Sequence, residues 1–152
     1  MDDDSSVLLK FEGGAKGVLL ASQVLSGEIN SLSIKVWGET GGIEWCQNDC
    51  NTLYVKSLDE PEKIYKSGTN ISYLTQAALS HSRIPSGHPE GYFEAFANLY
   101  RNFAYSVLER VEGRKVDKEI YDFPGIEDGI RGMLFVEKVL ESGKSDKKWI
   151  SY

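Results

Sequence analysis

The sequence predicts an α+β protein with a large, mostly antiparallel open sheet and helices packed on one of its faces. In the first half of the chain, short apolar segments alternate with glycine-rich turns, a pattern typical of antiparallel strands. In the second half, apolar residues recur at helical spacing. Strands come first and helices follow without alternation, which favours an α+β arrangement over parallel βαβ units.

The expected strands follow one another in a meander. Residues 7–11 and 17–22 flank a glycine-rich turn and predict a hairpin. Residues 31–36 alternate serine or lysine with apolar side chains, so one face of that strand is predicted to be buried. Further strands are expected at 43–45, 52–56 and 62–65. The glycine clusters join two strands each, so hairpin turns explain them better than a dinucleotide phosphate site does.

Two helices are expected in the second half. From Pro89 to Val111, apolar residues follow the i, i+3, i+4 rule for about six turns. The aromatic side chains of this helix are predicted to belong to the core, and Gly113 is placed to end it. A second helix is expected over residues 126–142, after a break at Asp-Phe-Pro-Gly. No linker is visible, so residues 1–152 are expected to form a single domain.

A sheet covered by helices on one face leaves its other face for a partner. Leu8, Leu19, Trp37 and Tyr54 are the candidates for that outer face. Such a patch predicts a homodimer or tetramer that assembles through the open sheet. Ordinary aromatic residues at a sheet edge are the alternative.

Composition restricts the partners and the compartment. The net charge is −6, and the 17 basic residues form no run, which disfavours nucleic acid. No apolar stretch is long enough for a membrane span, and the acidic start Met-Asp-Asp-Asp-Ser-Ser lacks signal-peptide features. A cytoplasmic protein is expected. Cys46 and Cys50 have no second pair for a structural zinc site, so free thiols are predicted, with a local disulfide as the alternative.

The candidate site residues gather between Arg83 and Glu90. In one reading, Pro89 opens the long helix and Glu90 suits the positive end of its dipole, so both are structural. In the other, that dipole favours a neutral imidazole at His88, which can exchange a hydrogen bond with a substrate hydroxyl. Arg83 and His81 would then add positive charge to the same pocket.

Several segments together resemble a known family. They include Asp-Ser-Ser-Val-Leu-Leu-Lys-Phe-Glu-Gly-Gly at 4–14, Trp-Gly-Glu-Thr-Gly-Gly at 37–42, and Pro-Ser-Gly-His-Pro-Glu-Gly-Tyr at 85–92. In this order they look like the C-terminal domain of the Gfo/Idh/MocA family, the relatives of glucose–fructose oxidoreductase and inositol dehydrogenase. The likeness covers nearly the whole chain and is most specific at Gly-His-Pro-Glu-Gly-Tyr.

The resemblance implies a two-part enzyme. In this family a Rossmann domain binds NAD or NADP, and the C-terminal domain holds a sugar or cyclitol and builds the oligomer. The family's Glu-Lys-Pro lysine and its Asp-x-x-x-His pair have no counterpart in these 152 residues. The chain is therefore expected to lack the Rossmann domain and its catalytic residues, to bind no cofactor or metal by itself, and to be inactive alone.

Within that resemblance, the substrate side of the site would be formed by His88, Glu90 and Arg83, with Gln23 on the sheet. The alternative is a non-enzymatic dimerisation or carbohydrate-binding module derived from the same fold. An in-frame Gly-x-Gly-x-x-Gly encoded immediately upstream would favour the enzyme.

Overall fold

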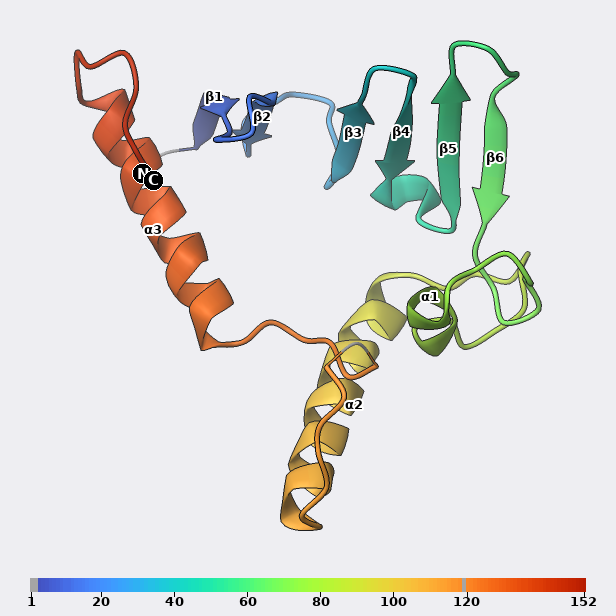
Figure 1. Ribbon diagram of the computed structural model, residues 1–152. Helices are drawn as coiled ribbons and strands as arrows, with labels where there is room; N and C mark the ends of the chain where they lie inside the picture. The colour runs from blue at the N-terminus through green and yellow to red at the C-terminus, as the bar shows by residue number, and fades with distance from the viewer. Residues whose placement is uncertain (1–2, 119) are drawn as a thin grey trace. The chain divides into compact units, whose positions relative to one another are not determined.

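The computed structural model of the chain, shown in Figure 1, describes residues 3–118 and 120–152. Met1 and Asp2, which open the acidic start of the sequence, lie outside the described residues. The chain divides into two compact units, one formed by the segment up to Ile29 with Gly125–Tyr152 and the other by Asn30–Pro124. The α+β class and the antiparallel pairing are confirmed, whereas the single domain stays a prediction.

The first unit contains a hairpin and a helix. Strands β1 (Asp4–Lys10) and β2 (Lys16–Ser22) pair in antiparallel register, with Leu8 opposite Val18 and Val7 opposite Leu19. Paired residues share a face and neighbours along a strand alternate, so Leu8 and Leu19 lie on opposite faces. The prediction that both belong to one outer face was wrong. The cause is the hairpin register, which the length of the turn sets.

Helix α3 spans Ile126–Gly143 and thus includes the glycine expected just beyond its end. The side chain of Asp128 accepts a hydrogen bond from the backbone N–H of Gly125 (2.8 Å) and caps the first turn. At the chain's end the Tyr152 hydroxyl donates to the carbonyl of Arg131 (2.7 Å), and its ring meets Phe135 edge-on. These contacts hold the C-terminal segment against the helix.

The second unit contains a four-stranded antiparallel sheet, visible in Figure 1 in the order β3 (Ser33–Trp37), β4 (Gly41–Cys46), β5 (Thr52–Ser57) and β6 (Lys63–Lys66). A Cβ atom on Gly41 would collide with the carbonyl of Lys56, and one on Gly42 would lie 2.9 Å from that of Val36. These two glycines allow neighbouring backbones to approach closely. The cluster joins β3 and β4 as predicted, but Gly41 and Gly42 lie within β4 and not in the turn itself.

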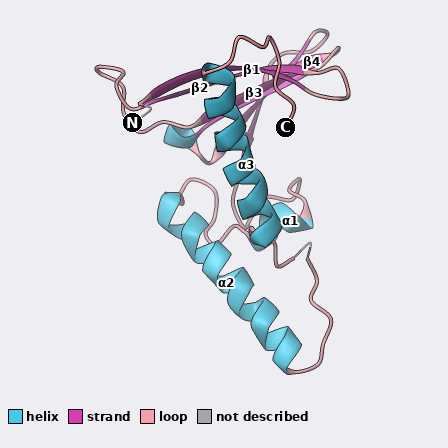
Figure 2. Cartoon of the chain, turned by 90° about the vertical axis from the view of Figure 1, so that its left-hand side faces the viewer, coloured by secondary structure: helices cyan, strands magenta, loops and turns pink. Residues whose placement is uncertain are grey.

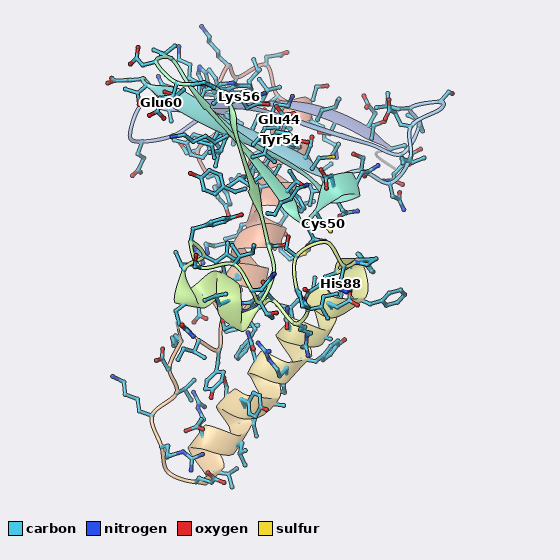
Figure 3. The ribbon with its side chains drawn as sticks, turned by 90° about the vertical axis from the view of Figure 1, so that its right-hand side faces the viewer. Glu44, Cys50, Tyr54, Lys56, Glu60 and His88 are labelled. Atoms are coloured by element: carbon cyan, nitrogen blue, oxygen red, sulfur yellow. The ribbon has the colours of Figure 1, made fainter. Side chains whose placement is uncertain are left out.

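The two faces of this sheet differ in chemistry. One face carries apolar side chains from all four strands: Ile34, Val36, Ile43, Trp45, Leu53, Val55 and Tyr65. On the other face the Glu44 carboxylate lies between the ammonium groups of Lys35 (2.8 Å) and Lys56 (2.7 Å). Trp37 and Tyr54 share this charged face, as the register shows, and Figure 3 shows Glu44, Tyr54 and Lys56 on the sheet.

After the sheet, the second unit continues with the helices α1 and α2, drawn in cyan in Figure 2. The short helix α1 (Gln76–Ser80), capped by the Thr75 hydroxyl, and the 3₁₀ turn Gln47–Asp49 were not predicted. Helix α2 spans Tyr92–Val111. It ends before Gly113, whose φ of +72° suits the expected C-terminal glycine. No helix in the described part of the chain is long and apolar enough to cross a membrane.

Helix α2 begins later than predicted. Its N-cap is Gly91, whose backbone N–H donates to the side chain of Glu94 (2.8 Å). Pro89 and Glu90 therefore precede the helix, and the prediction that Pro89 opens it was wrong. A capping contact from a residue three positions into the helix outweighed the preference for proline in the first turn.

Burial in this chain reverses the expected pattern. Among the described residues no apolar side chain is buried, and the buried polar ones are Thr52, Asn98, Asn102 and Ser106. The prediction that the aromatic face of α2 forms the core was wrong for this chain, because Phe93 is 84% exposed and Tyr100 73%. The helix instead turns a stripe of polar residues, at positions 98, 102 and 106, toward its neighbours.

Candidate functional site

A pocket of about 430 Å³ lies within the second unit. Its walls come from the end of β4 and the start of β5, from the C-terminal end of α1, and from the first turns of α2. It is lined by Trp45, Gln47, Cys50, Asn51, Ser67, Ala78, His81, Ser82, Glu90, Gly91, Tyr92, Glu94, Ala95, Asn98 and Leu99. Figure 3 labels Cys50, on the strand side of this region, and His88 on the loop that precedes α2.

Glu90 connects the sheet, the loop and the helix start. Its carboxylate accepts hydrogen bonds from the backbone N–H of Arg83 (2.8 Å) and of Ile84 (3.4 Å). Its carbonyl accepts from the Cys50 thiol (3.1 Å) and from the Asn51 side-chain amide (2.7 Å). Glu90 therefore shapes the pocket by fixing the loop at one side and the strand ends at the other.

The strand side of the pocket is fixed by short-range contacts. The indole N–H of Trp45 donates to the carbonyl of Cys50 (2.9 Å), which closes the turn between β4 and β5. The Thr52 hydroxyl, buried at the start of β5, donates to the carboxylate of Asp49 (2.7 Å). The Ser67 hydroxyl donates to the side-chain oxygen of Asn51 (2.8 Å). Most polar groups of this wall thus already have partners within the protein.

Arg83 is held by helix α2. Its Nε (3.1 Å) and Nη2 (2.8 Å) both donate to the side-chain oxygen of Asn98. Asn98 is only 5% exposed and donates in turn to the carbonyl of His81 (2.8 Å). Arg83 and Glu90 therefore lie side by side, but of the two only Glu90 lines the pocket.

The other two predicted site residues lie elsewhere. His88 is exposed and does not line the pocket; its Nδ1 is 3.1 Å from the carbonyl of Pro85. Gln23 belongs to the first unit, where its backbone N–H donates to the carbonyl of Asp3 (2.8 Å).

Charge is distributed unevenly over the second unit. The ammonium groups of Lys35 and Lys56 lower the pKa of Glu44 from 4.5 to about 2, chiefly through their hydrogen bonds. Beside the pocket, hydrogen bonds from the backbone N–H groups of Gly91 and of Glu94 itself lower the pKa of Glu94. The pocket edge thus carries a carboxylate that stays ionised at neutral pH.

Sequence reasoning missed Asn98 and Asn102, the buried polar residues beside the pocket. Their signal was present as polar residues at positions 98, 102 and 106, spaced four apart on one helix face. An amphipathic helix normally buries its apolar stripe, so the apolar residues of this helix, and not the polar ones, were expected to face the core.

The described residues offer no metal centre, since no three His, Cys, Asp or Glu side chains among them form a suitable group. Cys46 and Cys50 are free thiols. The pocket lining offers both hydrogen-bonding groups and apolar surface.

Comparison with known proteins finds relatives that are described as oxidoreductases. The family model described as "Oxidoreductase family, C-terminal alpha/beta domain" (GFO_IDH_MocA_C) matches residues 1–151. The uncharacterized oxidoreductase YfiI of Bacillus subtilis is 28% identical over 155 residues, which cover the whole of this chain and 38% of that protein.

Solved structures of oxidoreductases resemble this chain over nearly its whole length. An oxidoreductase from Sinorhizobium meliloti is 38% identical, with a TM-score of 0.88 over 98% of this chain and 41% of its own. An inositol dehydrogenase homolog from Azotobacter vinelandii, complexed with NADH and myo-inositol, is 32% identical, with a TM-score of 0.86 over 99% of this chain and 39% of its own. The chain spans about two fifths of the length of these relatives. It belongs to the C-terminal domain family of the Gfo/Idh/MocA oxidoreductases.

Proposed function

We propose that this chain is the substrate-binding and assembly domain of an NAD(P)-dependent oxidoreductase that acts on a sugar or cyclitol hydroxyl. The observation that carries the proposal is the likeness, over 99% of the chain, to an inositol dehydrogenase homolog complexed with NADH and myo-inositol. The nicotinamide would accept or donate the hydride, and a domain outside these residues would hold it.

The proposal that this chain binds no cofactor by itself is supported by its glycines. A dinucleotide site needs a glycine-rich turn between a strand and the start of a helix. Here Gly14, with φ of +87°, lies in the β1–β2 turn, and Gly41 and Gly42 lie in β4 against neighbouring strands. These clusters do not fit a nicotinamide dinucleotide.

We assign the substrate contacts to the loop before α2 and to the sheet. His88 is exposed and has its Nδ1 near a carbonyl, which leaves the other ring nitrogen directed to a ligand hydroxyl. Arg83 would add a cation held by Asn98, and Glu90 would set the loop's shape. Gln23, which belongs to the first unit, stays a separate candidate for substrate contact.

We further propose that the open surfaces are covered in the assembled protein. The apolar sheet face includes Ile34 (56% exposed) and Val36 (49% exposed). Patches of this kind mark protein contacts. The cofactor domain and a second copy of the chain are the proposed partners. The two free thiols suit the reducing cytoplasm, which is the proposed compartment.

The test compares this chain with the same chain joined to a dinucleotide-binding domain of its own gene or of a relative. We expect the joined protein to reduce NAD or NADP with myo-inositol or another cyclitol, followed by nicotinamide absorbance. The chain alone should bind no NADH in a fluorescence titration up to millimolar concentration. Micromolar NADH binding by the chain alone would contradict the proposal, and cyclitol binding without any turnover of the joined protein would favour the non-enzymatic module.

His88→Ala in the joined protein tests the site. We expect KM for the cyclitol to rise while the Kd for NADH stays the same. Lys16→Ala, in the hairpin of the first unit, is the control for a general loss of folding. Equal kinetics for His88→Ala and the parent would remove His88 from the site.

A further inference from the structure

The buried amide of Asn102 joins three segments of the second unit. Asn102 lies on α2 and is 0% exposed. Its Oδ1 accepts hydrogen bonds from Nε (3.2 Å) and Nη2 (3.0 Å) of Arg101. Its Nδ2 donates to the carbonyl of Asp122 (2.8 Å) and lies 2.9 Å from Nε2 of His81. The amide thus links α2 to the residue after α1 and to the segment that follows α2.

These partners leave the amide one orientation. A guanidinium only donates hydrogen bonds and a backbone carbonyl only accepts them. Turning the amide over would set its N–H groups against Arg101 and its oxygen against the carbonyl of Asp122. The Nδ2–H therefore faces His81, and Nε2 of His81 has to accept.

The other ring nitrogen of His81 has the opposite role. Nδ1 is 2.7 Å from the carbonyl of Ala77, so it has to carry a hydrogen; the Ser80 hydroxyl is also within 3.1 Å. The contacts fit only the neutral ring with its hydrogen on Nδ1. A second proton on Nε2 would point directly at an N–H of Asn102, and both groups would lose their partner.

We propose that His81 and Asn102 form a proton-sensitive latch that holds one wall of the pocket at neutral pH and releases it when His81 takes up a proton. His81 and Asn98 line the pocket, and the Asn98 side chain donates to the carbonyl of His81 (2.8 Å). The latch thus fixes the end of α1 and the turn that leads to Arg83. Releasing it frees that wall from α2.

The charged groups around His81 set the direction of the change. Arg101, which also donates to the carbonyl of Ser80 (2.7 Å), places a positive charge on the α2 side of this cluster. Arg83 lies two residues further along the chain, and Asp122 meets the amide of Asn102 through its backbone carbonyl. Across the pocket, Glu90 and Glu94 line the same cavity. A protonated ring is therefore repelled from α2 and attracted toward the cavity.

His88 provides an internal control. Its Nδ1 contacts the carbonyl of Pro85, and it lies on an exposed loop. A proton added at Nε2 leaves Nδ1–H as a donor, so this contact survives protonation. The chain's two histidines should differ in whether titration changes the structure.

The test combines imidazole nitrogen NMR with amide hydrogen exchange on the 152-residue chain between about pH 8 and pH 5. We expect His81 to be the neutral Nδ1–H form at the upper end. On acidification, exchange at the amides of Leu79, His81 and Ser82, which close α1, should rise about tenfold beyond the intrinsic rate change, equivalent to about 1.4 kcal/mol. A hydrogen on Nε2 at neutral pH, or protection that does not change with pH, would overturn the proposal.

Two matched variants separate the histidines. In His81→Gln the side-chain oxygen can accept from Asn102 in place of Nε2 and does not titrate, so we expect the acid response of α1 to disappear. His88→Gln should leave that response intact. If His88→Gln abolished it and His81→Gln did not, the latch would be refuted. Should His81→Gln fail to fold, the position of the hydrogen on the His81 ring of the unaltered chain still tests the proposal.

Discussion

Substitution of Asn98 tests which hydrogen bond stabilises the pocket wall. Asn98 accepts two hydrogen bonds from Arg83 and donates one to the carbonyl of His81, while only 5% exposed. Asn98→Ala removes all three. Water can replace the partner of the exposed Arg83, but the His81 carbonyl is left without its donor, which costs about 1–3 kcal/mol.

Asn98→Asp separates the two contacts. The carboxylate keeps the acceptor for Arg83 and adds charge to it, which strengthens that bond. It has no N–H to offer His81 and puts an oxygen against the carbonyl. If the His81 contact dominates, as we expect, the aspartate variant is at least as destabilised as the alanine variant.

The assay is urea unfolding followed by tryptophan fluorescence, since Trp45 lines the same pocket. With a slope of about 1–3 kcal/mol per molar urea, a loss of about 2 kcal/mol lowers the midpoint by about 1 M. The exposed Asn48→Ala is the matched control and should leave the midpoint unchanged. Wild-type stability in Asn98→Asp would refute the reasoning and assign the effect to Arg83.

Three further predictions concern the rest of the molecule. Glu44, with its pKa lowered to about 2, contributes stability that is present above about pH 4.5 and lost as the pH falls toward 2. When Lys35 and Lys56 are both replaced by methionine, carboxyl NMR should show the pKa of Glu44 move toward 4.5. Phe93→Ser with Tyr100→Ser should lower the sedimentation coefficient of the assembled protein, because these side chains lie on the open face of α2; an unchanged coefficient would place the contact elsewhere. Gly41→Ala should destabilise the sheet, since a Cβ there meets a neighbouring carbonyl, whereas Gly13→Ala, with open space around it, should not, as thermal unfolding of both can show.

The sequence predicted the elements better than their faces. Short apolar segments bounded by turns located every described strand within a few residues, because both signals are local. The start of α2 was displaced because the contact between Gly91 and Glu94 competed with a proline preference of similar size. The short helix α1 has too few residues to show a periodic pattern.

The pocket residues were only partly predictable for a different reason. Arg83 and Glu90 are close in sequence, so a loop could bring them together. The partners of Asn102 lie 21 and 20 residues away, at His81 and Asp122. Periodicity shows that a helix has a polar stripe, but it does not show which other segments will pack against that stripe.

Much of the apolar surface of this chain is open to water. Hydrophobic residues make up 41% of the sequence, as in an ordinary globular protein, yet no apolar side chain of the described residues is fully buried. Apolar surface of this extent is stable only when it is removed from water. The apolar faces of the sheet and of α2 are therefore the surfaces that the proposed partners would cover. In this chain polar hydrogen bonds at Glu90, Asn98 and Asn102 preserve the pocket region, while its hydrophobic stabilisation depends on the proposed partners.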